Sequence, residues 1–100
     1  MAKSVVAYAT LTVADTAIGL SSASTAITHA VTGAIITLET AQIRWRADGT
    51  VPTDTEGHIM NISDALDFSE GNWQELLNRI RFIRTGATSG ALKITYLRTA

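Results

Sequence analysis

The chain has 100 residues, no cysteine and a formal net charge of −1 at pH 7. A chain of this length is typical of one domain, here residues 1–100, and it buries enough surface for one hydrophobic core. The missing cysteines exclude a disulfide framework and a thiolate metal site. The near-zero charge argues against strong non-specific binding to nucleic acid or to an anionic membrane, so neither is an expected partner.

The stretch from Thr16 to Leu38 contains no charged residue. Its many Ser, Thr and Gly residues make it too polar for a membrane span. It holds more uncharged surface than we expect a small sandwich to bury alone. We therefore expect residues 1–34 to contact another copy of the chain, as in a trimer seam, or a lattice of other proteins.

The N-terminal third begins with an alternating pattern over Val5–Val13, which predicts a strand with its odd-numbered residues on one face. A short second strand is expected at Thr16–Leu20. Residues 21–28 are rich in Ser, Thr and Ala and suit a low-complexity linker. The β-branched residues of Thr25–Val31 favour instead a strand or a packed loop.

Two further strands are predicted in the middle of the chain, at Ala34–Glu39 and at Gln42–Ala47. Only Thr40 and Ala41 separate them, so we expect the two strands to pair as a hairpin. That pairing would place Glu39 within reach of Arg44 or Arg46.

The second half predicts more short strands and at most one short helix, near Trp73–Leu77. Asn72 is a candidate helix cap, with Glu75 at the capping-box position. The remaining segments are strands at Gly57–Met60, Ile62–Phe68 (at a sheet edge), Arg79–Arg84 and Leu92–Tyr96, with a hairpin loop at Gly86–Gly90. The pattern indicates an all-β protein, a small β-sandwich or jelly-roll-like barrel of about seven or eight antiparallel strands.

A polar loop follows the Gln42–Ala47 strand and is expected to fix one end of the sandwich. Its structural residues are Asp48, Gly49, Pro52, Thr53, Gly57 and His58. Asp48, Asp54 and Glu56 offer oxygen ligands, but their spacing does not match a calcium loop. A zinc site would need both His29 and His58 with a carboxylate. We therefore expect no metal and no cofactor, and we interpret His58 as a structural residue that bonds to the loop backbone.

Four basic side chains are candidates for one exposed sheet face: Arg44, Arg46, Arg81 and Lys93. The aromatic residues of these strands fall on the opposite parity, unlike a base-stacking surface. This face is either a solvated surface or a docking site for an acidic protein. Trp73 lies outside the regular alternation, and it is either a partly exposed anchor for a partner or a lid over the core. No arrangement typical of a catalytic site is present, and no catalytic residue is predicted.

Two sequence segments resemble small virion proteins of tailed bacteriophages. The first is Ile43-Arg44-Trp45-Arg46 with Asp48-Gly49, Pro52-Thr53, Thr55 and Gly57-His58; the second runs from Leu77 to Arg84 and continues with Thr88–Leu92 and Ile94-Thr95-Tyr96. The similarity covers about residues 35–98. It implies a non-enzymatic β-sandwich of the virion, assembled in the host cytoplasm.

Within the virion, the resemblance is compatible with more than one role. The first is a capsid decoration (cement) protein that self-associates, as a trimer, and binds the major capsid protein. The alternative is a tail, fibre or neck module that binds a host saccharide or another virion protein.

Overall fold

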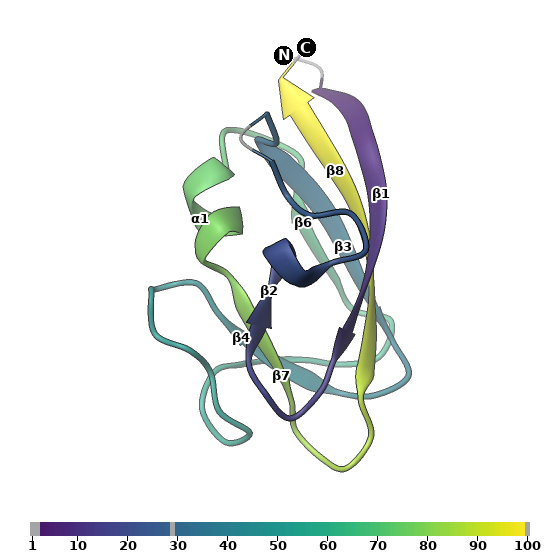
Figure 1. The fold of residues 1–100 in the computed structure, drawn as a ribbon, viewed down its shortest axis with the longest axis vertical. Helices are drawn as coiled ribbons and strands as arrows, with labels where there is room; N and C mark the ends of the chain where they lie inside the picture. Colours follow the sequence, from purple (N-terminus) through teal and green to yellow (C-terminus); the bar gives the residue numbers. More distant parts are fainter. Residues whose placement is uncertain (1–2, 29, 100) are drawn as a thin grey trace.

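The computed structural model describes residues 3–28 and 30–99 (Figure 1). Within these ranges the chain forms eight strands, one 3₁₀ turn and one short α-helix. In chain order they are β1 (Lys3–Val13), β2 (Ile18–Gly19), η1 (Leu20–Ser22), β3 (Gly33–Glu39), β4 (Ile43–Arg46), β5 (His58–Met60), β6 (Ala65–Phe68), α1 (Gln74–Arg79), β7 (Arg81–Arg84) and β8 (Gly90–Thr99).

The strands form two four-stranded antiparallel sheets. Sheet A has the order β1-β8-β3-β6 and sheet B has the order β2-β7-β4-β5. The first strand pairs with the last, the second with the seventh, the third with the sixth and the fourth with the fifth, as in one long hairpin. Additional pairs β3–β8 and β4–β7 roll this hairpin into two layers. The order is that of an eight-stranded jelly roll, so the predicted fold class is confirmed.

The core lies between the two sheets because alternate residues of each strand point inward. In the two C-terminal strands the alternation of the sequence predicts that Phe82, Leu92, Ile94 and Tyr96 point inward, and all four are buried. Helix α1 packs against the core through Leu77, and the main-chain N–H of Trp73 donates to the carbonyl of Thr32, 2.8 Å away.

The boundaries of several elements differ from the predicted ones. β7 begins at Arg81 because Arg79 still belongs to α1, and β8 is longer than the Leu92–Tyr96 segment. In the described part of Thr25–Val31 no strand forms, so the packed-loop alternative holds. The Tyr96 hydroxyl donates to the carbonyl of Thr25 at 2.9 Å, and Ile27 packs on the core.

The predicted hairpin between β3 and β4 is wrong. β3 belongs to sheet A and β4 to sheet B, so the Thr40-Ala41 link carries the chain from one layer to the other. Thr40 has a φ of 82°, a left-handed conformation that turns the chain within one residue. Glu39 forms no ion pair with Arg44 or Arg46 within the described ranges.

The Gly86–Gly90 loop is likewise not a hairpin, because β7 lies in sheet B and β8 in sheet A. A short loop between two strands is compatible with a hairpin and with a crossing between layers. The distinction depends on pairs formed with distant strands, here β8 with β1 and β3.

The alternation predicted for the first strand holds only from Ala7 onward. The register of β1 against β8 shifts between Val5 and Ala7, and Val5 is 69% exposed. This β-bulge inserts one residue and breaks the two-residue period, so Val5 no longer shares a face with Ala9 and Leu11.

Most large side chains of the uncharged Thr16–Leu38 stretch are buried without a second chain, although Ile35 is 38% exposed. The five fully buried side chains of this stretch lie in the molecule's own core: Leu20, Val31, Ala34, Ile36 and Leu38. Burial of these residues therefore gives no reason for an intermolecular contact, because jelly-roll pairing places β3 in the middle of sheet A. The contact expected for residues 1–34 stays a prediction.

Candidate functional site

The polar loop, residues 47–57, connects β4 to β5, and local hydrogen bonds hold its shape. The Thr53 hydroxyl accepts from the main-chain N–H of Glu56 at 3.0 Å. The main chains of Thr53 and Glu56 also bond to each other in both directions. Pro52 is buried beneath this turn, whereas Val51 is exposed. These contacts agree with a structural loop.

Arg44 fastens the polar loop to the outer face of sheet B. Its guanidinium donates to the carbonyl of Asp54 at 3.1 Å and to the carbonyl of Gly57 at 2.8 Å. Gly57 has a φ of 139°, and a Cβ there would lie 3.1 Å from the Trp45 carbonyl oxygen. The close approach requires glycine, and the arginine is directed toward its own chain.

Arg46 forms a two-point ion pair with Asp48 at the start of the polar loop. The Arg46 Nε donates to Asp48 Oδ1 at 3.0 Å, and the Arg46 Nη2 donates to Asp48 Oδ2 at 2.5 Å. This hydrogen bonding holds the pKa of the Asp48 carboxyl below its usual value of 3.8 and raises the pKa of Arg46. Both side chains are exposed enough for water and salt to weaken the pair.

The four predicted basic residues do not share one face. Arg44, Arg46 and Arg81 lie on sheet B, but Lys93 is on β8 in sheet A, between Thr10 and Thr37 of the neighbouring strands. The prediction of one continuous basic face is therefore wrong. It failed because strand parity gives the face of a strand but not the sheet to which that strand belongs.

Arg81 lies directly opposite Arg46 across β4 and β7. Like charges in this arrangement repel, and each arginine turns to a separate partner. Arg81 donates to the main-chain carbonyls of Asn78 and Ile80, at 3.1 and 2.9 Å. It also fills the space above Gly19, where a Cβ would come within 2.6 Å of the guanidinium.

His58 lies at the edge of a cleft of about 440 Å³, which is lined by Arg46, Ala47, Asp48, Glu56, Gly57 and His58. The His58 ring packs on Trp45 with centroids 4.8 Å apart. Among the described residues its ring makes no hydrogen bond to the loop backbone, so that part of the prediction is wrong. No group of three or more metal-ligating side chains occurs in residues 3–28 and 30–99. His29, the other histidine that a zinc site would need, lies outside the described residues.

A second cleft, of about 560 Å³, lies where the polar loop meets the end of β7. Its lining includes Asp15, Asp54 and Arg84. The guanidinium of Arg84 is 3.4 Å from the Ser89 hydroxyl, a long hydrogen bond. The lining therefore mixes both signs of charge, two carboxylates with one guanidinium.

Trp73 is half-buried at the start of α1. Its ring packs against Phe68 with centroids 5.1 Å apart, and its indole N–H donates to the carbonyl of Glu70. The predicted cap at Asn72 is wrong, because the N-cap residue is Trp73, which makes no side-chain cap hydrogen bond. Asn72 precedes it, and its side-chain oxygen accepts from the main-chain N–H of Gln74 at 3.0 Å. These contacts favour the lid interpretation over the anchor interpretation, because both the ring and its polar atom are engaged within the chain.

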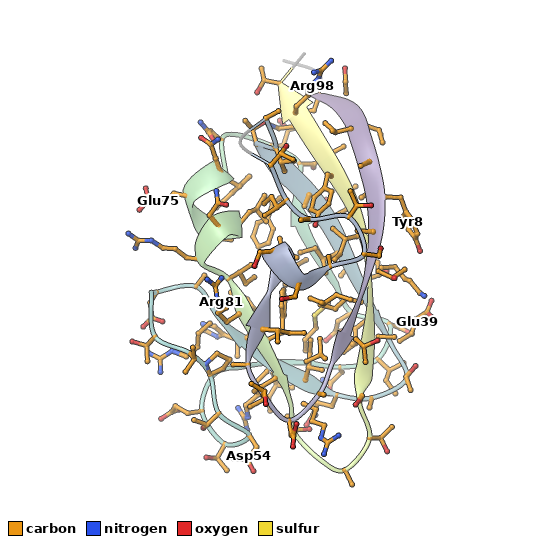
Figure 2. All side chains as sticks on the ribbon, viewed as in Figure 1. Tyr8, Glu39, Asp54, Glu75, Arg81 and Arg98 are labelled. Atoms are coloured by element: carbon orange, nitrogen blue, oxygen red, sulfur yellow. The ribbon has the colours of Figure 1, made fainter. Side chains whose placement is uncertain are left out.

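Sequence reasoning missed an exposed apolar group on β1. Val5, Val6 and Tyr8 are 69, 41 and 58% exposed, and Figure 2 shows Tyr8 projecting from β1 away from the body of the molecule. The adjacent Val5-Val6 pair interrupts the alternation, and this was the available signal of a bulge.

Comparison of the chain with models of protein families, with curated proteins and with solved structures finds no match. No helix in the described part of the chain is long and apolar enough to cross a membrane.

Proposed function

We propose that this protein is a non-enzymatic structural component of a tailed-phage virion, assembled in the host cytoplasm. Its role is that of a capsid decoration protein that self-associates and binds the major capsid protein. The observation that carries the proposal is the jelly-roll strand order, an architecture used by viral capsid and lectin domains. This is an analogy at the level of the fold, and the resemblance of residues 35–98 to phage virion proteins gives it direction.

The distribution of polar contacts supports an assembly role. Arg44, Arg46 and Arg81 are directed at carbonyls or a carboxylate of their own chain, where they hold the polar loop and the end of α1. The outer face of sheet A carries Glu39, Lys93 and Asp67 among uncharged side chains. Its central row across the strands is Tyr8, Thr95, Ile35 and Asp67. A β-face on which charged side chains of both signs lie among uncharged ones suits contact with another protein.

A capsid-binding experiment tests the proposal. Purified protein is added to capsids assembled without it, and the bound copies are counted after sedimentation. Saturable binding at a fixed number of copies per capsid supports decoration. Absence of binding to capsids, with binding to tails or necks, would overturn that role in favour of a tail or neck module.

Saccharide binding by a fibre module is a second candidate, because jelly rolls also serve as lectin domains. An exposed aromatic side chain would serve such a site, and the candidate, Trp73, is packed against Phe68. A glycan array with Trp73→Ala as control tests the idea. Binding that Trp73→Ala abolishes, while the variant remains folded, would support a sugar site at the start of α1.

A further inference from the structure

The free edge of β1 is divided into a closed and an open half. In the closed half, Thr10 exchanges two hydrogen bonds with Ser24: its carbonyl accepts from the Ser24 N–H at 2.8 Å, and its N–H donates to the Ser24 hydroxyl at 2.9 Å. Beyond the end of the strand, the carbonyl of Ala14 accepts from the N–H of Arg84 at 3.0 Å. The 3₁₀ turn with the loop after it, and sheet B, thus cover this half.

The open half runs from Lys3 to Tyr8. Alternate residues of a strand direct their main-chain N–H and C=O groups to the same side. The main-chain groups of Thr10 point away from β8, toward Ser24, and the main-chain groups of Tyr8 therefore also point away from β8. Among the described residues nothing accepts from or donates to them. β1 is also the longest edge, with 11 residues against two to four in β2, β5 and β6.

The open half lacks the charged side chains that usually protect a sheet edge. No charged residue occurs from Ser4 to Ala14. The one charge at the start of the strand, Lys3, is directed across the sheet, where its amine donates to the Thr32 hydroxyl at 3.1 Å. Val5, Val6 and Tyr8 are instead exposed beside the unpaired main chain. A fitting occupant is an extended, uncharged strand with apolar side chains.

We propose that this occupant is β1 of a second copy, paired antiparallel about a two-fold axis near Val6. β1 has the required composition itself, and self-pairing brings no like charges together. The two A sheets would then form one continuous eight-stranded sheet. This dimer would be the self-association named in the proposed function, and the inference rests on that function. A two-fold contact makes a dimer, and it therefore competes with the trimer expected from the sequence.

A charge placed on the open half tests the contact. The double variant Val5→Lys/Tyr8→Lys is compared with Thr12→Lys, which adds a charge on the same strand in the closed half, at an exposed position. Light scattering across concentration measures the mass. We expect a dimer for the natural chain and for Thr12→Lys, and a dimer dissociation constant raised about tenfold or more in the double variant. A concentration-independent monomer, a trimer, or a dimer that the double variant leaves intact would overturn the proposal.

A disulfide provides a second test that does not depend on weakening the fold. The chain contains no cysteine, so a single introduced thiol can form a disulfide only between copies. Val6→Cys is expected to oxidise to a covalent dimer at low concentration, whereas Thr12→Cys remains monomeric. Equal cross-linking of the two variants would contradict edge pairing.

Capsid binding tests the proposed function separately from the edge contact. Natural dimers that do not bind capsids would overturn decoration and leave the edge contact intact. Capsid binding by a natural chain that is monomeric would overturn the edge contact alone. An extended peptide of another virion protein that protects the edge of a monomeric chain would also replace the second copy as the occupant.

Discussion

Gly57 is the residue on which the return of the polar loop depends. Its φ of 139° is a conformation that side chains rarely adopt, and an added Cβ would meet the Trp45 carbonyl at 3.1 Å and the Pro52 Cβ at 3.2 Å. Gly57→Ala is therefore expected to lower the free energy of unfolding by roughly 1–3 kcal/mol, as measured by denaturant titration.

Gly86→Ala is the matched control for this change, because no atom lies within 4 Å of the position that the added methyl group would take and its φ is not left-handed. It should change the free energy of unfolding by no more than about 0.5 kcal/mol. Equal effects of the two substitutions would show that Gly57 is not held as described.

Asp48 makes the free energy of unfolding depend on pH in the acid range. Its folded pKa lies below 3.8 because of the hydrogen bond from Arg46. The unfolded chain therefore binds more protons in acid, and the stabilisation is present above about pH 4 and lost as the pH falls through the lower folded pKa. Asp48→Asn should reduce the slope of unfolding free energy against pH below this value.

Arg46→Gln removes the same hydrogen bond from the other side and should reduce the slope in the same way. A residual slope is expected in both variants, because hydrogen bonds from Ser69 also lower the pKa of Asp67. An unchanged slope in Asp48→Asn would mean that the ion pair does not persist in solution.

Helix α1 acts as a lid over one side of the sandwich, and Trp73 joins it to β6. Trp73→Ala removes the ring packed on Phe68 and the N–H bonded to Glu70. A cost of about 1–3 kcal/mol is expected for a half-buried ring, and thermal unfolding measures it. Trp73→Phe retains a ring without the N–H, so it should retain part of the stability.

The same two variants separate the lid from the partner-anchor interpretation of Trp73. A lid predicts lower stability with unchanged capsid binding by the folded protein. An anchor predicts the reverse: Trp73→Ala would remain as stable as the natural chain and lose its binding.

At the scale of elements, most strands could be predicted from the sequence, but their partners could not. The two-residue period identified β1, β3, β4 and β8, because each buries one face on the same core. Periodicity carries no information about which strand lies beside another. The Thr40-Ala41 link therefore looked like a hairpin, and Lys93 was grouped with three arginines of the other sheet.

The candidate site shows the same limit in another form. The residues of the polar loop were identified because Gly, Pro, Asp and Thr have local preferences that the sequence displays. What Arg44 and Arg81 do was not identified, because their partners are main-chain carbonyls with no sequence signature. The exposed edge of β1 results from a bulge and from Ser24, which bonds to Thr10 and leaves the N-terminal half of the edge open. Both features follow from tertiary packing.

The whole molecule is one interleaved unit, since each sheet combines strands from both halves of the chain. Lys3 pairs with Thr99, so the described ends of the chain meet at one end of the sandwich (Figure 1). Among the described residues, every pair of neighbouring strands joins one strand from each half of the chain. Unfolding should therefore occur in one cooperative transition, with coincident curves from fluorescence and circular dichroism.

Circular permutation tests this interleaving directly. A short glycine linker joins Thr99 to Lys3, and new ends are opened between Gly86 and Ala87, in the exposed link between the two sheets. The jelly roll needs the pairs of strands and not this particular link, so the permutant should fold with one cooperative transition. A control opened between Ile36 and Thr37 cuts β3, which pairs on both sides with β6 and β8, and should not fold. If both permutants folded equally well, β3 would not be the centre of sheet A, and the strand order would be wrong.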